Sequence, residues 1–438
     1  MALDAGRFAE GLDLYEKVRG AHLAHDRPVE LARTARLVSL ALGRLGRVGE
    51  GIELMLAAVP VLESTDEVAL AALEANLGAR LWFVGRREEA TVHVDRALSL
   101  AERHREPAVE AKARGIRGSL LATARQVTDA VREAAIGIDL AERHGLTLDE
   151  AYGRLNLGDI LIQADLPGGA EQTRRAIQLA RRVGDAGQVA FCAGNLATHA
   201  FFAGDWDEAE QAARQALETA PDDYQRDTLR YVLLLLHLAR GRDTDAAAEL
   251  TAIERLDGTD DVQDQTFLAV ARAAAAHARQ DMKAVHQAAT AALATVVDTF
   301  GPFSEGYRLL WPLAAEAALR TARHDELQMM LDATQSLPGD GIPPYIQAQV
   351  HRSRALLAAA RDRQHQVEDD LRRAVEILDG LGYPYFRAEA QTDLAHWLQS
   401  QSRHSDAEPV RDQARDTFTR LGAQPALARL DASMATAG

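Results

Sequence analysis

The chain has 438 residues, of which 47% are hydrophobic and 26% are charged, and this apolar content excludes an intrinsically disordered protein. Acidic residues outnumber basic ones by 65 to 49, so the net charge of −16 argues against a protein that binds nucleic acid through its whole surface. The single cysteine, Cys192, excludes an internal disulfide and a metal site built from several thiolates.

The N-terminal residues carry charges at Asp4, Arg7 and Glu10 and therefore lack the apolar core of a signal peptide. The longest apolar run, residues 231–239, is interrupted by His237 and is too short to span a bilayer. We expect a cytoplasmic protein without a membrane partner.

One pattern recurs eleven times: an apolar helix, a turn with Gly or a polar residue, and a charged residue followed by Ala. Two helices of about 14 to 16 residues with short connections fill the period of about 40 residues. No alternating β-branched run with hairpin turns intervenes, so the sequence predicts an all-α fold. The turns are expected at Gly6, Gly46, Gly85, Arg125, Asp165, Gly204, Gly241, Gln280, Arg323, Arg363 and Ser402.

The fifth unit shows the pattern most clearly, with Leu196, Ala197, Gly204, Ala209 and Pro221 at regular spacings. Small residues permit close helix contact, and Gly tolerates the turn conformation. These spacings resemble the tetratricopeptide repeat, as do the segments 76–78 and 156–158, which both read Asn-Leu-Gly. The resemblance implies a right-handed superhelical solenoid of about ten to eleven helix pairs.

We expect residues 1–438 to form a single solenoid with three parts. Residues 1–26 are predicted to be an incomplete first unit, because the apolar helix expected over residues 5–18 has no partner helix before it. Residues 27–259 hold the better-matching repeats, and residues 260–438 hold degenerate repeats and a C-terminal cap.

The segments 381–387, 392–395 and 418–423 resemble the terminal repeats of large bacterial signalling ATPases, namely LuxR-type large ATP-binding regulators and cyclase-linked relatives. In those families an ATPase module precedes the repeats, which sense an inducer or a partner. The resemblance implies that an N-terminal ATPase or cyclase module is fused to this chain in the full-length protein. The helix-turn-helix that follows the repeats in LuxR-type members has no counterpart here, so no direct nucleic-acid contact is expected.

Motifs of catalysis are absent from the sequence. The three lysines, Lys17, Lys112 and Lys283, do not follow a glycine, which excludes a phosphate-binding GxxxxGK[ST] loop, and no histidine begins an HExxH motif. GxSxG and GxGxxG are also missing. We expect no enzyme, no cofactor and no metal.

Three local features admit a chemical and a structural interpretation. Cys192 is a possible nucleophile, but a lone helical cysteine is more often a buried small hydrophobe. His22 and His25 would share a helix face as metal ligands or lie on a solvated surface. The acidic segment 257–264 lacks the Gly and the closing Glu of a calcium loop and is predicted to be a turn with helix-capping aspartates.

A groove on the concave face is the expected binding surface, because the first helix of each pair lines that face in the family that the chain resembles. Asn76, Asn156 and Asn195 all lie nine residues before the turn, where an amide can hold a peptide backbone. The equally weighted alternative is that these amides bond within their helix or to a neighbouring repeat.

Aromatic and charged side chains complete the candidate groove. Trp82-Phe83 and Phe201-Phe202 share a register just before the turn, where they would clamp an apolar ligand or pack in the core. Arg33 and Arg36 would meet a carboxylate or phosphate unless they form a solvated face. The remaining candidates are Tyr152, Asp159 and Thr198.

The sequence thus predicts a non-catalytic module that binds a protein, a peptide or a small-molecule inducer, as the sensor of a bacterial signalling or transcriptional regulator. The alternative is a free-standing scaffold that assembles other proteins. We expect the ligand in the N-terminal half, because first helices of the other half mostly carry apolar residues in the asparagine register, as at Ala271 and Ala314, with Arg354 and Asp393 as exceptions.

Overall fold

A computed structural model describes residues 8–24, 27–220, 222–302, 304–337 and 341–435. These residues form 22 α-helices and two short 3₁₀ turns, at Glu254–Leu256 and Gln364–Gln366, and include no β-strand, which confirms the predicted all-α fold. The predicted turn at Gly6 and the pair His22 and His25 lie outside the residues whose side chains are described. None of the described helices has the length and hydropathy needed to cross a bilayer.

Helices α2 to α21 form ten consecutive pairs, which confirms a solenoid built from helix pairs. Single helices stand at the two ends, with α1 (Phe8–Ala24) packed on α2 and α22 (Gln424–Ala435) packed on α12 and α21. The pairs are α2 (Pro28–Arg44) with α3 (Val48–Glu63), α4 (Glu67–Phe83) with α5 (Arg87–His104), α6 (Pro107–Thr123) with α7 (Val127–Arg143), α8 (Thr147–Gln163) with α9 (Gly169–Val183), α10 (Ala186–Ala203) with α11 (Trp206–Thr219), α12 (Asp223–Arg240) with α13 (Asp243–Ile253), α14 (Val262–Ala278) with α15 (Met282–Phe300), α16 (Glu305–Arg320) with α17 (His324–Gln335), α18 (Pro344–Ala360) with α19 (Val367–Gly380), and α20 (Pro384–Ser400) with α21 (His404–Leu421).

Glycine permits the close approach of the two helices in the pairs that match the repeat pattern best. A Cβ on Gly78 of α4 would lie 3.1 Å from the carbonyl oxygen of Ala90 on α5. A Cβ on Gly158 of α8 would lie equally close, 3.1 Å, to the carbonyl oxygen of Gly169 on α9. The expected role of these small residues in helix contact is therefore confirmed.

A residue in the left-handed conformation ends the first helix of every pair. It is the predicted residue in eight of the ten pairs, but in two it comes one position earlier, at Ala322 and Asp362, where Arg323 and Arg363 were predicted. Six of the ten turn residues are not glycine. Without a glycine, the sequence does not mark which residue adopts the positive φ angle, and those two predictions were wrong for this reason.

The first helices of the pairs lie on the inside of the curve. Successive first helices, such as α4, α6 and α8, contact each other, whereas successive second helices make few contacts. The helices that are closer together must line the concave side. We call the surface formed by α2, α4, α6, α8 and α10 the N-terminal inner face.

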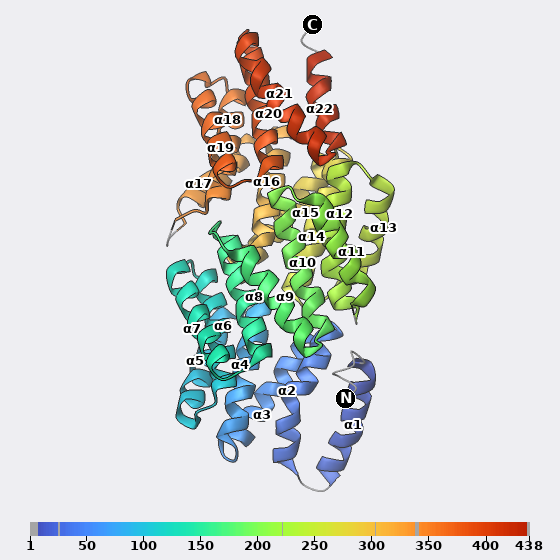
Figure 1. Cartoon of the computed structure of the whole chain (residues 1–438), viewed down its shortest axis with the longest axis vertical. Coiled ribbons are helices and arrows are strands. Elements are labelled where there is room, and N and C mark those ends of the chain that lie inside the picture. Colours follow the sequence, from blue (N-terminus) through green and yellow to red (C-terminus); the bar gives the residue numbers. More distant parts are fainter. Residues whose placement is uncertain (1–7, 25–26, 221, 303, 338–340, 436–438) are drawn as a thin grey trace.

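The superhelix closes on itself, a feature that the sequence analysis did not predict. The turns between paired helices in the first half lie against segments that precede first helices of the second half, and Figure 1 shows the two halves stacked along the long axis of the molecule. A Cβ on Gly46 would be 3.8 Å from Thr259, one on Gly85 would be 2.9 Å from Thr299, and one on Gly241 would be 3.2 Å from Pro425. The contacts follow the whole seam between the two superhelical turns.

The seam is held at its centre by a buried ion pair between Asp165 and Arg308. Arg308 Nη1 lies 2.8 Å from Asp165 Oδ1, and the two side chains are 2% and 0% exposed. Asp165 also accepts hydrogen bonds from the Tyr383 hydroxyl at 3.0 Å and from the Tyr345 backbone N–H at 2.7 Å. The guanidinium group stacks on the rings of Phe202 and Tyr345, at 4.9 and 4.7 Å from their centroids. Both charges are therefore fully satisfied across the seam.

We expect the Arg308→Met variant to lose about 3–5 kcal/mol of unfolding free energy, because it leaves a buried carboxylate without its cation. Urea denaturation would measure the loss. The control is Arg415→Met, which breaks the exposed pair with Asp431 and should cost less than about 1 kcal/mol. Equal losses in the two variants would show that the seam does not depend on Arg308.

Candidate functional site

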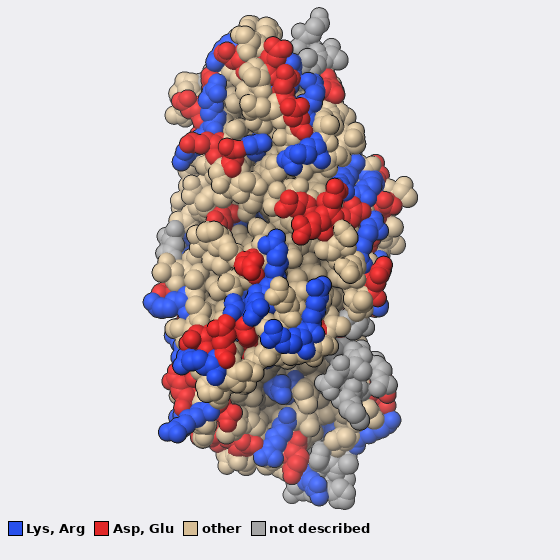
Figure 2. Space-filling view, in the orientation of Figure 1, with Lys and Arg blue, Asp and Glu red and all other residues tan. Residues whose placement is uncertain are grey.

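The N-terminal inner face carries a cluster of cations. Lys112 on α6 donates a hydrogen bond of 2.6 Å to Oδ1 of Asn76 on α4, and the Asn76 amide nitrogen donates to the Ala72 carbonyl oxygen. Arg36 from α2 and Arg80 from α4 lie close enough to Lys112 to act on its charge. Three successive first helices thus bring three cations together. In Figure 2, Lys and Arg atoms lie in a hollow at the level of α2.

The environment of Lys112 disfavours its charge. Desolvation, followed by the charges of Arg36 and Arg80, lowers its pKa to about 8, and the carboxylate of Asp149 on α8 opposes this effect. Lys112 is still partly exposed to solvent, so the group lies in a hollow that solvent enters and is not sealed in a core. A cation cluster in a solvent-accessible hollow, in which Arg36 has no ion-pair partner among the described residues, is suited to bind an anion.

The three asparagines, which are the only ones in the sequence, differ in their bonding. Asn76 holds Lys112, and the Asn195 amide on α10 donates to both carboxylate oxygens of Asp159 on α8, at 3.0 and 3.1 Å. The Asn156 amide is partly exposed beside Gly115 and makes no hydrogen bond to another described residue. Two of the amides therefore bond to a neighbouring repeat, and that of Asn156 is available.

The predicted aromatic clamps serve internal packing. Phe201 and Phe202 are buried, 6% and 2% exposed, and their rings pack against Tyr383, Tyr385 and other aromatic residues of the second half. Trp82 and Phe83 pack against Phe300 on α15, and the Trp82 indole N–H donates to the Thr123 hydroxyl at 3.2 Å. These four aromatic residues hold the seam of the superhelix together. They therefore pack in the core, as the alternative to a ligand clamp predicted.

The other predicted residues divide between the inner face and structural roles. Arg33 is engaged in an ion pair with Asp66, the residue that caps α4. Thr198 is buried and bonds to the carbonyl oxygen of Gly194 in its own helix. Tyr152 is 42% exposed on α8, four residues before Asn156. Of these three residues, Tyr152 lies where a ligand on the inner face would meet it.

The first helices of the second half neutralise each other. Opposite charges on neighbouring first helices form a continuous series of ion pairs, in which one residue often serves two partners. The pairs are His277 with Glu316 at 3.1 Å, Arg352 with Asp393 at 2.5 Å and with Glu389 at 3.8 Å, and Arg429 with Glu389 at 3.4 Å. The expected exception Asp393 is therefore paired, and so is Arg354, with Asp370 on α19.

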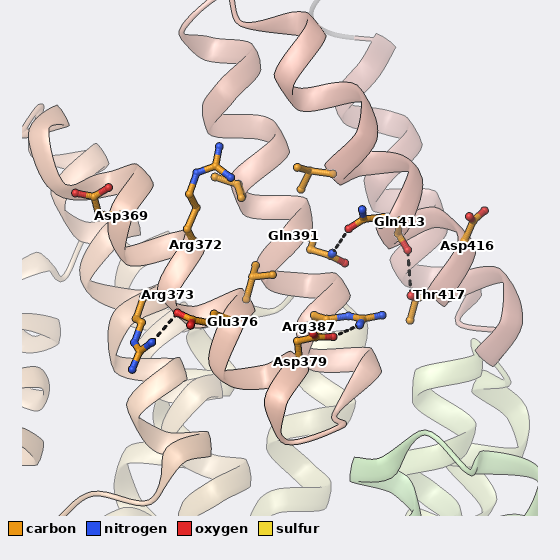
Figure 3. Close-up of a pocket in the computed structure, with 13 residues that line it drawn as sticks. Asp369, Arg372, Arg373, Glu376, Asp379, Arg387, Gln391, Gln413, Asp416 and Thr417 are labelled. Atoms are coloured by element: carbon orange, nitrogen blue, oxygen red, sulfur yellow. Dashed lines mark hydrogen bonds and ion pairs between the residues drawn. The ribbon is translucent and has the colours of Figure 1, made fainter.

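A groove of about 960 Å³ lies between α19, α20 and α21 (Figure 3). Its arginines are in ion pairs: Arg373 with Glu376 at 2.6 Å, Arg387 with Asp379, and Arg372 with Glu368 outside the groove. Gln391 and Gln413 bond to each other across its floor at 2.8 Å. Because its arginines are already paired, we do not assign an anionic ligand to this groove.

The cysteine and the acidic segment have the expected structural environments. Cys192 is buried, and burial raises the pKa of its thiol, so it is not poised as a nucleophile. Asp261 accepts hydrogen bonds from the N–H groups of Gln263 and Asp264 at the start of α14, which confirms the predicted cap. Across the described residues, no group of three or more His, Cys, Asp or Glu side chains is arranged to hold a metal ion.

Sequence analysis missed Arg80, Lys112, Asp149 and Glu305. Arg80 lies one helical turn after Asn76, and Lys112 lies one turn before the equivalent position of α6, so a search of the same helix face would have found both. The charge of Glu305 acts on Asp159 because the second half closes onto the first. No repeat spacing signals that contact.

Comparisons with known proteins found similarity in structure alone. No protein-family model matches the chain, and no curated protein matches it in sequence. The chain is similar to the human IFIT1 dimer with m7Gppp-AAAA, at 10% identity and a TM-score of 0.47 over 87% of this chain and 89% of that one. It is also similar to Rap protein complexed with competence and sporulation factor, at 13% identity and a TM-score of 0.45 over 87% and 98%. A third is the apo quorum sensor NprR from B. thuringiensis, at 12% identity and a TM-score of 0.36 over 92% and 99%. The assignment of a ligand therefore rests on the residues of this chain.

We expect the asparagines to differ in their effect on folding. Asn76→Ala should lower the unfolding free energy by about 1–3 kcal/mol, because it removes the acceptor of the Lys112 ammonium group. Asn156→Ala should stay within about 0.5 kcal/mol of the parent chain, because it breaks no internal bond. Chemical denaturation of both variants tests this, and a large loss in Asn156→Ala would make that residue structural.

Proposed function

We propose that the chain is a non-catalytic binding module whose N-terminal inner face takes up a peptide or small inducer with an anionic group. We further propose that this module is the sensor region of a bacterial signalling or transcriptional regulator. The observation that carries the proposal is the convergence of Arg36, Arg80 and Lys112 in a solvent-accessible hollow. Asp149 is the carboxylate that acts on Lys112 there.

Electrostatics favours the binding of an anion at the cluster of Arg36, Arg80 and Lys112. Like charges held close together raise the free energy of the chain, and an incoming carboxylate or phosphate lowers it by neutralising them. Arg36 makes no ion pair with another described residue, and a guanidinium group can bond to both oxygens of a carboxylate. The negative net charge of the whole chain, −16, would at the same time repel polyanions such as nucleic acids from the rest of the surface.

Neighbouring groups on the same helices fit the remainder of a peptide-like ligand. The Asn156 amide offers both a donor and an acceptor to a main-chain amide. Leu37 on α2 and Tyr152 on α8 are large side chains that are 43% and 42% exposed, and they offer apolar contact. The face therefore combines a charged anchor, a polar amide and apolar surface.

Thermal unfolding in the presence of a random octapeptide pool tests the proposal. We expect a pool with free C-terminal carboxylates to raise the Tm more than the same pool with amidated C-termini, since a ligand at a hundred times its Kd adds about 2.7 kcal/mol of stability. Lys112→Met should remove the difference between the pools. The control is Lys283→Met, which changes an exposed lysine and should keep it.

Two results would contradict the proposed function. One is the absence of any Tm change with either pool, which would favour the alternative of a scaffold that holds proteins by another surface. The other is a difference in Tm between the two pools that is as large for Lys112→Met as for the parent chain. That result would place the peptide elsewhere on the molecule.

A further inference from the structure

The groove between α19 and α21 opens on the outer side of the superhelix, because it lies between two successive second helices. Both helices pack on the first helix α20 but make few contacts with each other, and the groove fills the space between them (Figure 3). Its lining on α19 runs from Asp369 to Asp379, a rise of about 15 Å along the helix axis. An extended peptide of about five residues has the same length.

The floor of the groove holds a buried amide whose hydrogen bonds are incomplete. Gln391 on α20 is 4% exposed, and its amide nitrogen donates to Oε1 of Gln413 on α21 at 2.8 Å. The other end of this amide, Gln391 Oε1, is buried and has no hydrogen-bond partner. A buried amide oxygen without a donor is costly, so its position in the wall of a groove points to a donor that a partner brings.

Gln413 supplies the complementary group. Its side chain is exposed, its oxygen accepts the bond from Gln391, and its amide nitrogen donates to no described residue. Because only this bond holds the Gln413 side chain, it can turn aside and open Gln391 Oε1 to a peptide. The two glutamines then offer an acceptor and a donor, which match the N–H and C=O of one main-chain amide. An extended segment has these groups free, whereas an α-helix uses them in its own hydrogen bonds.

Carboxylates on the two banks of the groove favour a basic segment. Asp369 on α19 and Asp416 on α21 are exposed and form no ion pair with another described residue. The arginines of the lining, in contrast, are already paired. A lysine or arginine of a partner therefore meets a free carboxylate on either bank, and the net charge of −16 attracts such a partner. Apolar contact between the banks comes from Val375, Leu394 and Val410.

We propose that this groove binds an extended basic segment of a partner protein. A main-chain amide of the segment bonds to Gln391 and Gln413, and its basic side chains pair with Asp369 and Asp416. The groove shares no helix with the N-terminal inner face. The chain thus holds a partner protein on its outer side and its ligand on its inner face, through two separate surfaces.

The fluorescence anisotropy of a dye-labelled pentapeptide pool tests this inference. The pool is acetyl-Lys-X-Leu-X-Lys-amide, where X is any neutral residue except cysteine, and its blocked termini lack the carboxylate that the cluster at Lys112 would take. We expect saturable binding that weakens at least about tenfold when glutamate replaces both lysines. N-methylation of the central leucine, which removes the N–H that Gln391 Oε1 would accept, should also weaken binding about tenfold.

Two variants of the groove should weaken the binding of the lysine pool about three- to tenfold each, namely Gln413→Ala and Asp416→Asn. Both side chains are exposed, so the Tm should stay at the parent value and lost binding cannot be ascribed to misfolding. The matched controls are Gln211→Ala on α11 and Asp298→Asn on α15, which change exposed residues of the same types on other second helices. Both controls should bind the pool as the parent chain does.

Four results would overturn the inference. They are absent saturable binding, equal binding of the lysine and glutamate pools, unchanged binding by Gln413→Ala and Asp416→Asn, and a dimer of the parent chain that Gln413→Ala dissociates in sedimentation. The last result would make a second copy of this chain the occupant of the groove.

Lys112→Met separates this inference from the proposed function. It should bind the lysine pool as the parent chain does, because Lys112 lies on α6, outside the groove. Loss of binding in Lys112→Met would place these peptides on the inner face and would contradict the groove assignment. Binding to the groove together with no response to peptides that have free C-termini would leave the outer site standing and the anion site wrong.

Discussion

The buried ion pair between Asp165 and Arg308 constrains the whole superhelix. Removing two charges from water is costly, and the cost is offset only when both are paired and fully hydrogen-bonded, which here requires residues from both superhelical turns. The same contact sets the geometry of the inner face. Asp165 follows α8 and Arg308 lies near the start of α16, so the pairing that closes the seam also holds the start of α16 against the end of α8.

Sequence periodicity predicted the local structure well because each repeat is a self-contained unit. The apolar spacing and the small residues at Gly78 and Gly158 determine how two helices pack, and eight of ten turns lie at the predicted residue. The closure depends on the curvature accumulated over about five repeats, which no local spacing encodes. For that reason Phe201 and Phe202 were candidate ligand contacts in sequence and are seam residues in the structure.

The two halves of the chain use the same helix face in different ways. In the second half, charges such as Arg352 and Asp393 pair with each other between neighbouring first helices, and the face is internally compensated. In the first half, Arg36, Arg80 and Lys112 gather on neighbouring first helices, and Asp149 is the carboxylate that acts on Lys112. Such an arrangement lowers the stability of the empty protein and is suited to a ligand that brings the missing charges, as binding sites commonly trade stability for function. The proposed preference for the N-terminal half therefore rests on this difference in charge compensation more than on the aromatic residues.

The central claim is that the charge of Lys112 is only partly compensated in the free chain. It is tested most directly by the unfolding free energy of Lys112→Met as a function of pH. The folded pKa of about 8 lies below that of an unfolded lysine, so the charge destabilises the fold at neutral pH and ceases to do so as pH rises through about 10.5. At pH 7 we expect Lys112→Met to be more stable than the parent chain by about 1–3 kcal/mol, with the difference vanishing at high pH, while Lys283→Met changes little. A loss of stability in Lys112→Met at pH 7 would show that the lysine is a structural ion and would contradict the account.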